Sequence, residues 1–131
     1  MAANSPISIK QMSPQLLVAD LHRSISFYTK QLGFELAFIV DDFYAGLTKN
    51  GYSIHLKLGT PSEEQRRQKR ENNDLDIVFS IDEVEAIYTD LMEKPVTILQ
   101  PLCTRPYGRE FYLLDPDGYI LGFLEENAAN E

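Results

Sequence analysis

Apolar and polar residues alternate along this chain in a pattern that predicts the same order of elements twice. In the first half, the apolar run 15–19 predicts a strand. Asp20 is then placed to cap a helix, and Gly33 to end it. Three strands follow, at 34–40, 43–48 and 53–58, with an Asn-Gly turn between the last two.

The second half repeats this order. Residues 75–80 predict a strand, and Asp82 with Glu85 three positions later predicts a capping box for a second helix. Pro95 ends that helix, and 96–99 begin the next strand.

Residues 108–126 complete the repeat as two apolar strands joined by an Asp-Pro-Asp-Gly turn. Pro116 fixes φ at the second turn position, and Gly118 can take the positive φ that closes the turn. Gly122 lies in the middle of the last strand, where a glycine usually marks the close approach of a ligand or another backbone.

The two repeats predict a single α+β domain over residues 1–131. It consists of βαβββ modules at about 9–59 and 74–126, whose sheets form one curved mixed sheet around a cleft. The linker, at about 60–73, is polar and reads as a linker or an exposed helical turn. Its basic residues predict a solvated face: Arg66, Arg67, Lys69 and Arg70.

Composition narrows the class of protein. No apolar run approaches the roughly 20 residues of a membrane span, and no secretory signal opens the chain. The single cysteine, Cys103, fits a reducing compartment, which predicts a cytoplasmic protein. A net charge of −8 argues against nucleic acid as a partner and favours a cationic ligand electrostatically.

Three motifs carry a resemblance to a known family. The strand–helix segment 18–34, the segment 106–111 and the turn 115–118 are similar to those of the glyoxalase, bleomycin-resistance and extradiol-dioxygenase (vicinal oxygen chelate) superfamily. The segment 106–111 is similar to the bleomycin-resistance branch in particular. The resemblance implies paired βαβββ modules around a cleft and a homodimer.

In metal-dependent members, the resemblance implies one ligand from each of four strands. The matching positions here are Ser13, His55, Asp76 and Gly122. Only His55 and Asp76 are good donors, whereas a catalytic site needs three or more. We therefore expect no cofactor, with a divalent metal as the alternative.

The remaining candidates have open alternatives. His55 shares a polar strand face, so it is either a surface residue or, within the cleft, a partner of Asp76 that binds a ligand. Arg109 and Glu110 are either a solvated pair or, through Arg109 with Tyr107 and Phe111, part of the cleft mouth.

Most strand aromatics are expected in the core, and a minority, including Tyr44, in a pocket for planar or cationic ligands. Cys103 has no base near it in sequence, which argues against a nucleophile.

These features favour a small-molecule binding protein that sequesters a cationic or aromatic compound, such as a bleomycin-type antibiotic. Whether the chain is an enzyme stays open. The alternative is a metal-dependent lyase, isomerase or dioxygenase of the glyoxalase type with an atypical ligand set.

Overall fold

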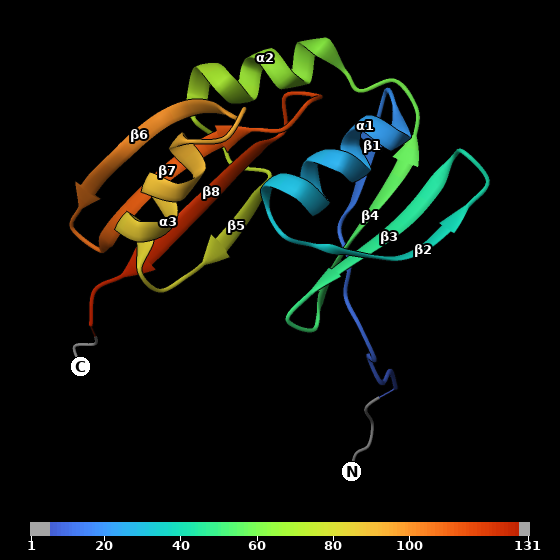
Figure 1. The fold of residues 1–131 in the computed structure, drawn as a ribbon, viewed down its shortest axis with the longest axis horizontal. Helices are drawn as coiled ribbons and strands as arrows, with labels where there is room; N and C mark the ends of the chain where they lie inside the picture. Colours follow the sequence, from blue (N-terminus) through green and yellow to red (C-terminus); the bar gives the residue numbers. More distant parts are fainter. Residues whose placement is uncertain (1–5, 129–131) are drawn as a thin grey trace. The chain divides into compact units, whose positions relative to one another are not determined.

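The structure is a computed structural model and describes residues 6–128. The chain divides after Gly59 into two compact units, each of which is considered by itself. Both have the order strand, helix, three strands, which confirms the predicted pair of α+β modules (Figure 1).

The first unit is a four-stranded mixed sheet with one helical segment. Its elements are β1 (Gln15–Val18), α1 (Leu21–Ser26), the π-helical turn η1 (Phe27–Gln31), β2 (Glu35–Val40), β3 (Tyr44–Lys49) and β4 (Tyr52–Leu58). The strand order is β1-β4-β3-β2, with β1 parallel to β4 and the other pairs antiparallel.

Local chemistry explains the boundaries of these elements. The Asp20 carboxylate accepts a hydrogen bond from the Arg23 amide at 3.0 Å and so caps α1. Gly33 ends the helical segment at φ 81°. Asn50 and Gly51 both have positive φ, 54° and 84°, as the tight turn between β3 and β4 requires.

The second unit has the same sheet order, β5-β8-β7-β6, with β5 parallel to β8. Its elements are α2 (Glu63–Asn72), β5 (Ile77–Ser80), α3 (Val84–Met92), β6 (Thr97–Arg105), β7 (Gly108–Leu114) and β8 (Ile120–Glu126). The Asp-Pro-Asp-Gly turn forms as predicted, with Gly118 at φ 90° and its amide donating to the Asp115 carbonyl at 3.0 Å.

The segment predicted to be a linker or an exposed helical turn contains a ten-residue helix, α2. The Ser62 hydroxyl caps it by accepting from the Gln65 amide at 3.2 Å, and Asn73 ends it in the left-handed region. The prediction of a solvated basic face is wrong for Arg66, whose side chain is buried, and holds for the exposed Arg67.

The predicted capping box of α3 is also wrong. The residue before the helix is Glu83, at φ 58°, and its side chain makes no cap. Glu125 of β8 does this instead, its carboxylate accepting from the Val84 amide at 2.9 Å. Glu85 bonds Arg109 rather than turning back to the helix start.

One face of each sheet is packed against a helix. Helix α1 lies over β3 and β4 in the first unit, and α3 lies over β6, β7 and β8 in the second (Figure 1). Side chains alternate between the two faces of each strand. We call the sheet face that α1 does not cover the face opposite α1, and the sheet face that α3 does not cover the face opposite α3.

Within residues 6–128, no helix has the length and apolar character needed to span a bilayer.

Candidate functional site

Strand register places His55 at the centre of the face opposite α1. Parallel pairing sets Gln15 of β1 beside His55 of β4, and antiparallel pairing sets Gly46 of β3 on its other side. The Tyr44 side chain, two residues from Gly46, shares this face.

Three polar side chains here form a hydrogen-bond relay. The Gln15 amide nitrogen donates to the Tyr44 hydroxyl at 3.0 Å, and that hydroxyl lies 2.9 Å from His55 Nδ1. The hydroxyl has one proton, and it can donate this proton to Nδ1 while it accepts from Gln15; we adopt this arrangement for the relay. A neutral His55 then carries its hydrogen on Nε2, where it is a donor for a ligand.

Aromatic rings stand beside this relay. The Phe38 ring meets His55 edge-on, with centroids 5.5 Å apart, and lies nearly parallel to Tyr44 at 6.2 Å. It also covers Gly46, since a Cβ at that position would lie 2.2 Å from the Phe38 ring. Phe38 is nevertheless 42% exposed, so the expectation that strand aromatics lie in the core is wrong here.

Ser13 precedes β1, and its hydroxyl is hydrogen-bonded to the Ser53 hydroxyl. Strand pairing places Gln15, not Ser13, beside His55. Ser13, the position that the resemblance matched on the first strand, therefore lies two residues before the residue that pairs with His55.

Asp76 precedes β5, and both of its carboxylate oxygens accept hydrogen bonds from groups within the second unit. Its Oδ2 accepts from Arg66 Nη1 at 2.7 Å and the Ile120 amide at 2.8 Å, and its Oδ1 from Lys69 Nζ at 2.7 Å and Arg66 Nη2 at 3.3 Å. Arg66 also stacks over Tyr119, 4.2 Å from the ring centroid. These contacts give Asp76 a structural role that holds α2 to β5 and β8.

The pKa of Asp76 reflects this environment. Burial acts to raise it, but the hydrogen bonds from Arg66, Lys69 and the Ile120 amide outweigh burial, so the pKa lies below its usual value. The carboxylate is charged at neutral pH and has both oxygens engaged. The pairing of Asp76 with His55 stays a prediction, because the two residues belong to different units.

Gly122 does not leave the expected space for a ligand. It pairs with Val78 of β5, and a Cβ built on it would lie 2.6 Å from Leu75 Cδ1. The leucine side chain occupies the space in front of this glycine, so the close approach that the glycine indicated comes from within the protein.

Two of the four paired strand positions carry no side chain that could ligate a metal. The two parallel strand pairs bring together Gln15 with His55 and Val78 with Gly122. Valine and glycine side chains carry no donor atom, and the first pair is engaged with Tyr44. Within residues 6–128, no three His, Cys, Asp or Glu side chains are grouped to hold an ion.

Arg109 and Phe111 project toward α3. Phe111 is fully buried between Tyr88 of α3 and Phe123, with both ring centroids 5.0 Å away. Arg109 Nη1 lies 3.2 Å from a Glu85 carboxylate oxygen of the same helix. Tyr107 lies in the turn before β7 and its hydroxyl bonds Glu110 instead, so these contacts do not group it with Arg109 and Phe111.

Glu110 is the centre of a polar cluster on the face opposite α3. Its Oε2 accepts three hydrogen bonds, each of 2.8 Å, from Arg105 Nε, the Tyr107 hydroxyl and the Tyr112 hydroxyl. Its side chain is buried, so neither a solvated pair nor a cleft-mouth pair with Arg109 describes it. Arg105 and Tyr112 were not among the residues predicted to be functional, although alternation from Glu110 placed Tyr112 on this face.

The cluster shifts several pKa values. Burial acts to raise the pKa of Glu110, but the bonds from Arg105, Tyr112 and Tyr107 outweigh it and the pKa is lowered. Burial, and then the bond to Glu110, raise the pKa of Tyr112 to about 12. The bond to Glu110 also raises the pKa of Tyr107 and of Arg105. At neutral pH the cluster therefore pairs one carboxylate with one guanidinium and two protonated phenols.

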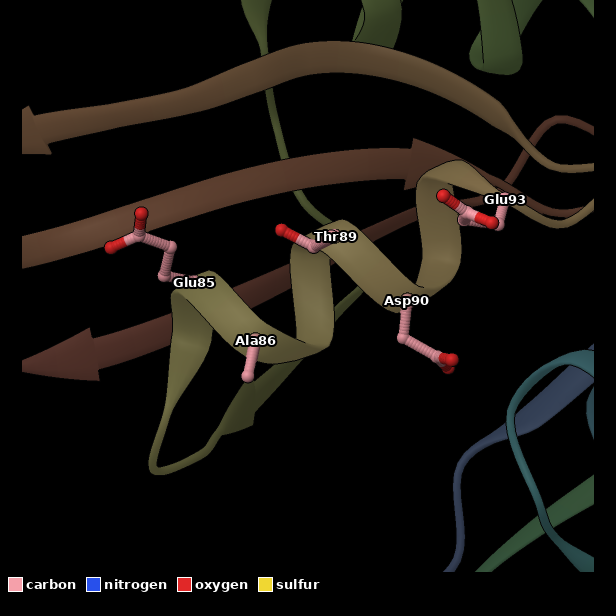
Figure 2. A pocket seen from close by; sticks show the side chains of 5 residues that line it. All are labelled: Glu85, Ala86, Thr89, Asp90 and Glu93. Carbon is pink, nitrogen blue, oxygen red and sulfur yellow. The ribbon is translucent and has the colours of Figure 1, made fainter.

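A hollow also lies on the surface of α3, and none of its lining residues belongs to the relay around Tyr44 or to the cluster around Glu110. Figure 2 shows its lining side chains projecting from this one helix: Glu85, Ala86, Thr89, Asp90 and Glu93. The lining side chains come from one short stretch of chain, and we assign the hollow no chemistry.

Comparisons with known proteins agree with the fold described above. The family profile described as Glyoxalase/Bleomycin resistance protein/Dioxygenase superfamily matches residues 9–123. No curated protein sequence matches the chain.

Solved structures share the fold at low sequence identity. The crystal structure of UcmS2 is 22% identical with a TM-score of 0.74, covering 92% of this chain and 100% of that one. TnmS3, an antibiotic binding protein from Streptomyces sp. CB03234, is 22% identical with a TM-score of 0.71, covering 95% and 100%. The bleomycin-binding protein of Streptomyces verticillus, complexed with copper(II)-bleomycin, is 20% identical with a TM-score of 0.68, covering 93% and 100%.

Proposed function

Because the chain belongs to the glyoxalase/bleomycin resistance protein/dioxygenase superfamily, we propose that it binds a small aromatic molecule and sequesters it without a catalytic metal. The observation that carries this proposal is the relay from Gln15 through Tyr44 to His55. It turns the imidazole into a fixed hydrogen-bond donor beside the exposed Phe38 ring.

This chemistry favours a particular kind of ligand. A planar ring system would stack against Phe38 and Tyr44, and a carbonyl or similar oxygen would accept from His55 Nε2–H. Residues 1–59 contain five basic and four acidic residues, so the net charge of −8 arises elsewhere in the chain. The near balance of charge in this unit gives no electrostatic preference for a cationic ligand, so stacking and the bond from His55 are the interactions expected to hold the ligand.

Two of the similar structures are named as proteins that bind an antibiotic or bleomycin. This supports a bleomycin-type antibiotic as the first compound to test. It also supports sequestration, rather than turnover, as the role of the site. We also propose a homodimer, as the resemblance implies, which size-exclusion chromatography with light scattering would test, and a cytoplasmic location, as the single cysteine predicts.

The ligand class is tested by calorimetric titration with three compounds. These are bleomycin, the planar cation proflavine and the neutral planar ketone acridone. We expect acridone to bind and Tyr44→Phe to weaken it about tenfold, because the phenylalanine cannot fix the His55 tautomer. Tyr52→Phe is the matched control, since Tyr52 is exposed at the hairpin and lies outside the relay.

Equal affinity in Tyr44→Phe and the parent protein would refute the relay as the binding element. A failure of all three compounds to bind would remove the proposed ligand class.

The metal status needs a separate measurement. Elemental analysis of the purified protein is expected to find no stoichiometric Ni, Zn, Mn or Fe. A stoichiometric metal that is lost in His55→Ala would overturn the proposal and favour the lyase, isomerase or dioxygenase alternative.

A further inference from the structure

We propose that Arg105 anchors a second binding site, on the face opposite α3, for the carboxylate of an aromatic monocarboxylic acid. The site belongs to the second unit, and the proposal does not rest on the function proposed for the relay of the first unit.

Arg105 is held in place through one edge of its guanidinium group. Its Nε donates to Glu110 Oε2 at 2.8 Å, and the same oxygen receives the hydroxyls of Tyr107 and Tyr112. Because all three bonds meet on Oε2, Arg105 does not form the two-pronged pair that arginine commonly makes with a carboxylate. Within residues 6–128, its terminal nitrogens donate to no other carboxylate and to no backbone carbonyl, and the Tyr112 hydroxyl is a further hydrogen-bond partner of the guanidinium group.

Arg66, in the same unit, has a purely structural role and serves as a comparison for Arg105. Both of its terminal nitrogens bond the Asp76 carboxylate, and its side chain is only 8% exposed. The Arg105 side chain is 38% exposed and bonds through Nε instead. The N–H groups of Arg105 that Glu110 and Tyr112 do not use can therefore donate to a carboxylate ligand.

The surroundings of Arg105 select the kind of anion. Tyr107 is 50% exposed, and its hydroxyl bond to Glu110 fixes the ring near the guanidinium. An aromatic ring attached to the bound carboxylate would pack against it.

Residues 60–131 contain sixteen acidic and seven basic residues, so a dianion such as phosphate is repelled more than a monoanion. Arg105 is already paired with Glu110, so a bound carboxylate is held by hydrogen bonds from the guanidinium group rather than by net positive charge.

Benzoate is the probe, and the full chain labelled with nitrogen-15 is the sample. We expect saturable NMR shifts of the backbone amides around Arg105, Tyr107 and Glu110. Benzamide, which has the same shape without the charge, should leave these amides unshifted. Arg105→Lys keeps the charge but lacks the fork, and should weaken benzoate about tenfold.

Arg105→Gln should abolish the shifts. Arg109→Gln is the matched control, because Arg109 is in the same hairpin but points toward α3, and it should bind like the parent protein. Melting temperatures establish that each variant is folded. If Arg105→Gln is not folded, Arg105→Lys alone still tests the proposal.

Three results would overturn the proposal. They are equal benzoate affinity in Arg105→Lys and the parent protein, equal shifts with benzamide, or tighter binding of inorganic phosphate than of benzoate. Failure of acridone to bind the first unit would leave this result unaffected, so the two proposals fail independently.

Discussion

The contact between α2 and its sheet gives the sharpest stability prediction. In Arg66→Ala, the Asp76 carboxylate loses two hydrogen bonds and the Tyr119 ring loses its stacked guanidinium. Removing one partner of a buried ion pair usually costs about 3–5 kcal/mol. Lys69 and the Ile120 amide still bond the carboxylate, so we expect the low end, about 3 kcal/mol.

Differential scanning calorimetry at pH 7 should show this loss. For a chain of this size, about 3 kcal/mol lowers the melting temperature by about 10 °C. The control is Arg67→Ala, one position further along α2. Arg67 pairs only with exposed Glu64 and Glu71, so its loss should shift the melting temperature by a small fraction of that amount. Equal shifts in the two variants would refute the structural role of Arg66.

The pH dependence gives a second check on the same contact. The folded-state pKa of Asp76 is lowered, so its stabilising contribution is complete above the unfolded value, about 3.9, and is lost as the pH falls through the folded value. The difference in unfolding free energy between the parent protein and Arg66→Ala should be constant from about pH 5 to 8 and narrow below about pH 4. A difference that widens in acid would contradict the argument.

Two further predictions concern the polar faces. Gly46→Ala should displace the Phe38 ring, at a cost of about 1–3 kcal/mol from overpacking, and weaken acridone binding; unchanged affinity would show that the ring is not part of the site. In Glu110→Gln, the pKa of Tyr112 should fall from about 12 toward its usual value while burial keeps it above 10, as followed by tyrosinate absorbance or labelled-tyrosine NMR. A pKa that stays at about 12 would mean that burial alone causes the shift.

The order of elements was predictable because it depends on local signals. Asp20, Gly33 and the Asn50-Gly51 pair act within a few residues of their own position, and each does what its chemistry predicts. Helix α2 was not recognised because it lacks an apolar stripe and is anchored through the charged side chain of Arg66. A salt bridge to a residue ten positions away leaves no periodic pattern in the sequence.

The candidate site was less predictable because it depends on register and on contacts between distant residues. Nothing in the residues before β1 or β5 marks where pairing begins, and the matched positions Ser13 and Asp76 both precede their strands. The space in front of Gly122 is filled by Leu75, which is 47 positions earlier in the chain. The opposite orientation of Arg109 and Glu110 was predictable, because consecutive residues of β7 point to opposite faces of the sheet.

The equivalent register of the two parallel strand pairs bears on how this scaffold can change over evolutionary time. Backbone pairing sets Gln15 beside His55 in one module and Val78 beside Gly122 in the other, and no side chain at these positions is needed to hold the strands together. One copy can therefore keep polar groups while the other becomes inert, with both sheets intact. In a duplicated chain of this kind, coordination chemistry can be lost or regained one module at a time, without a new fold.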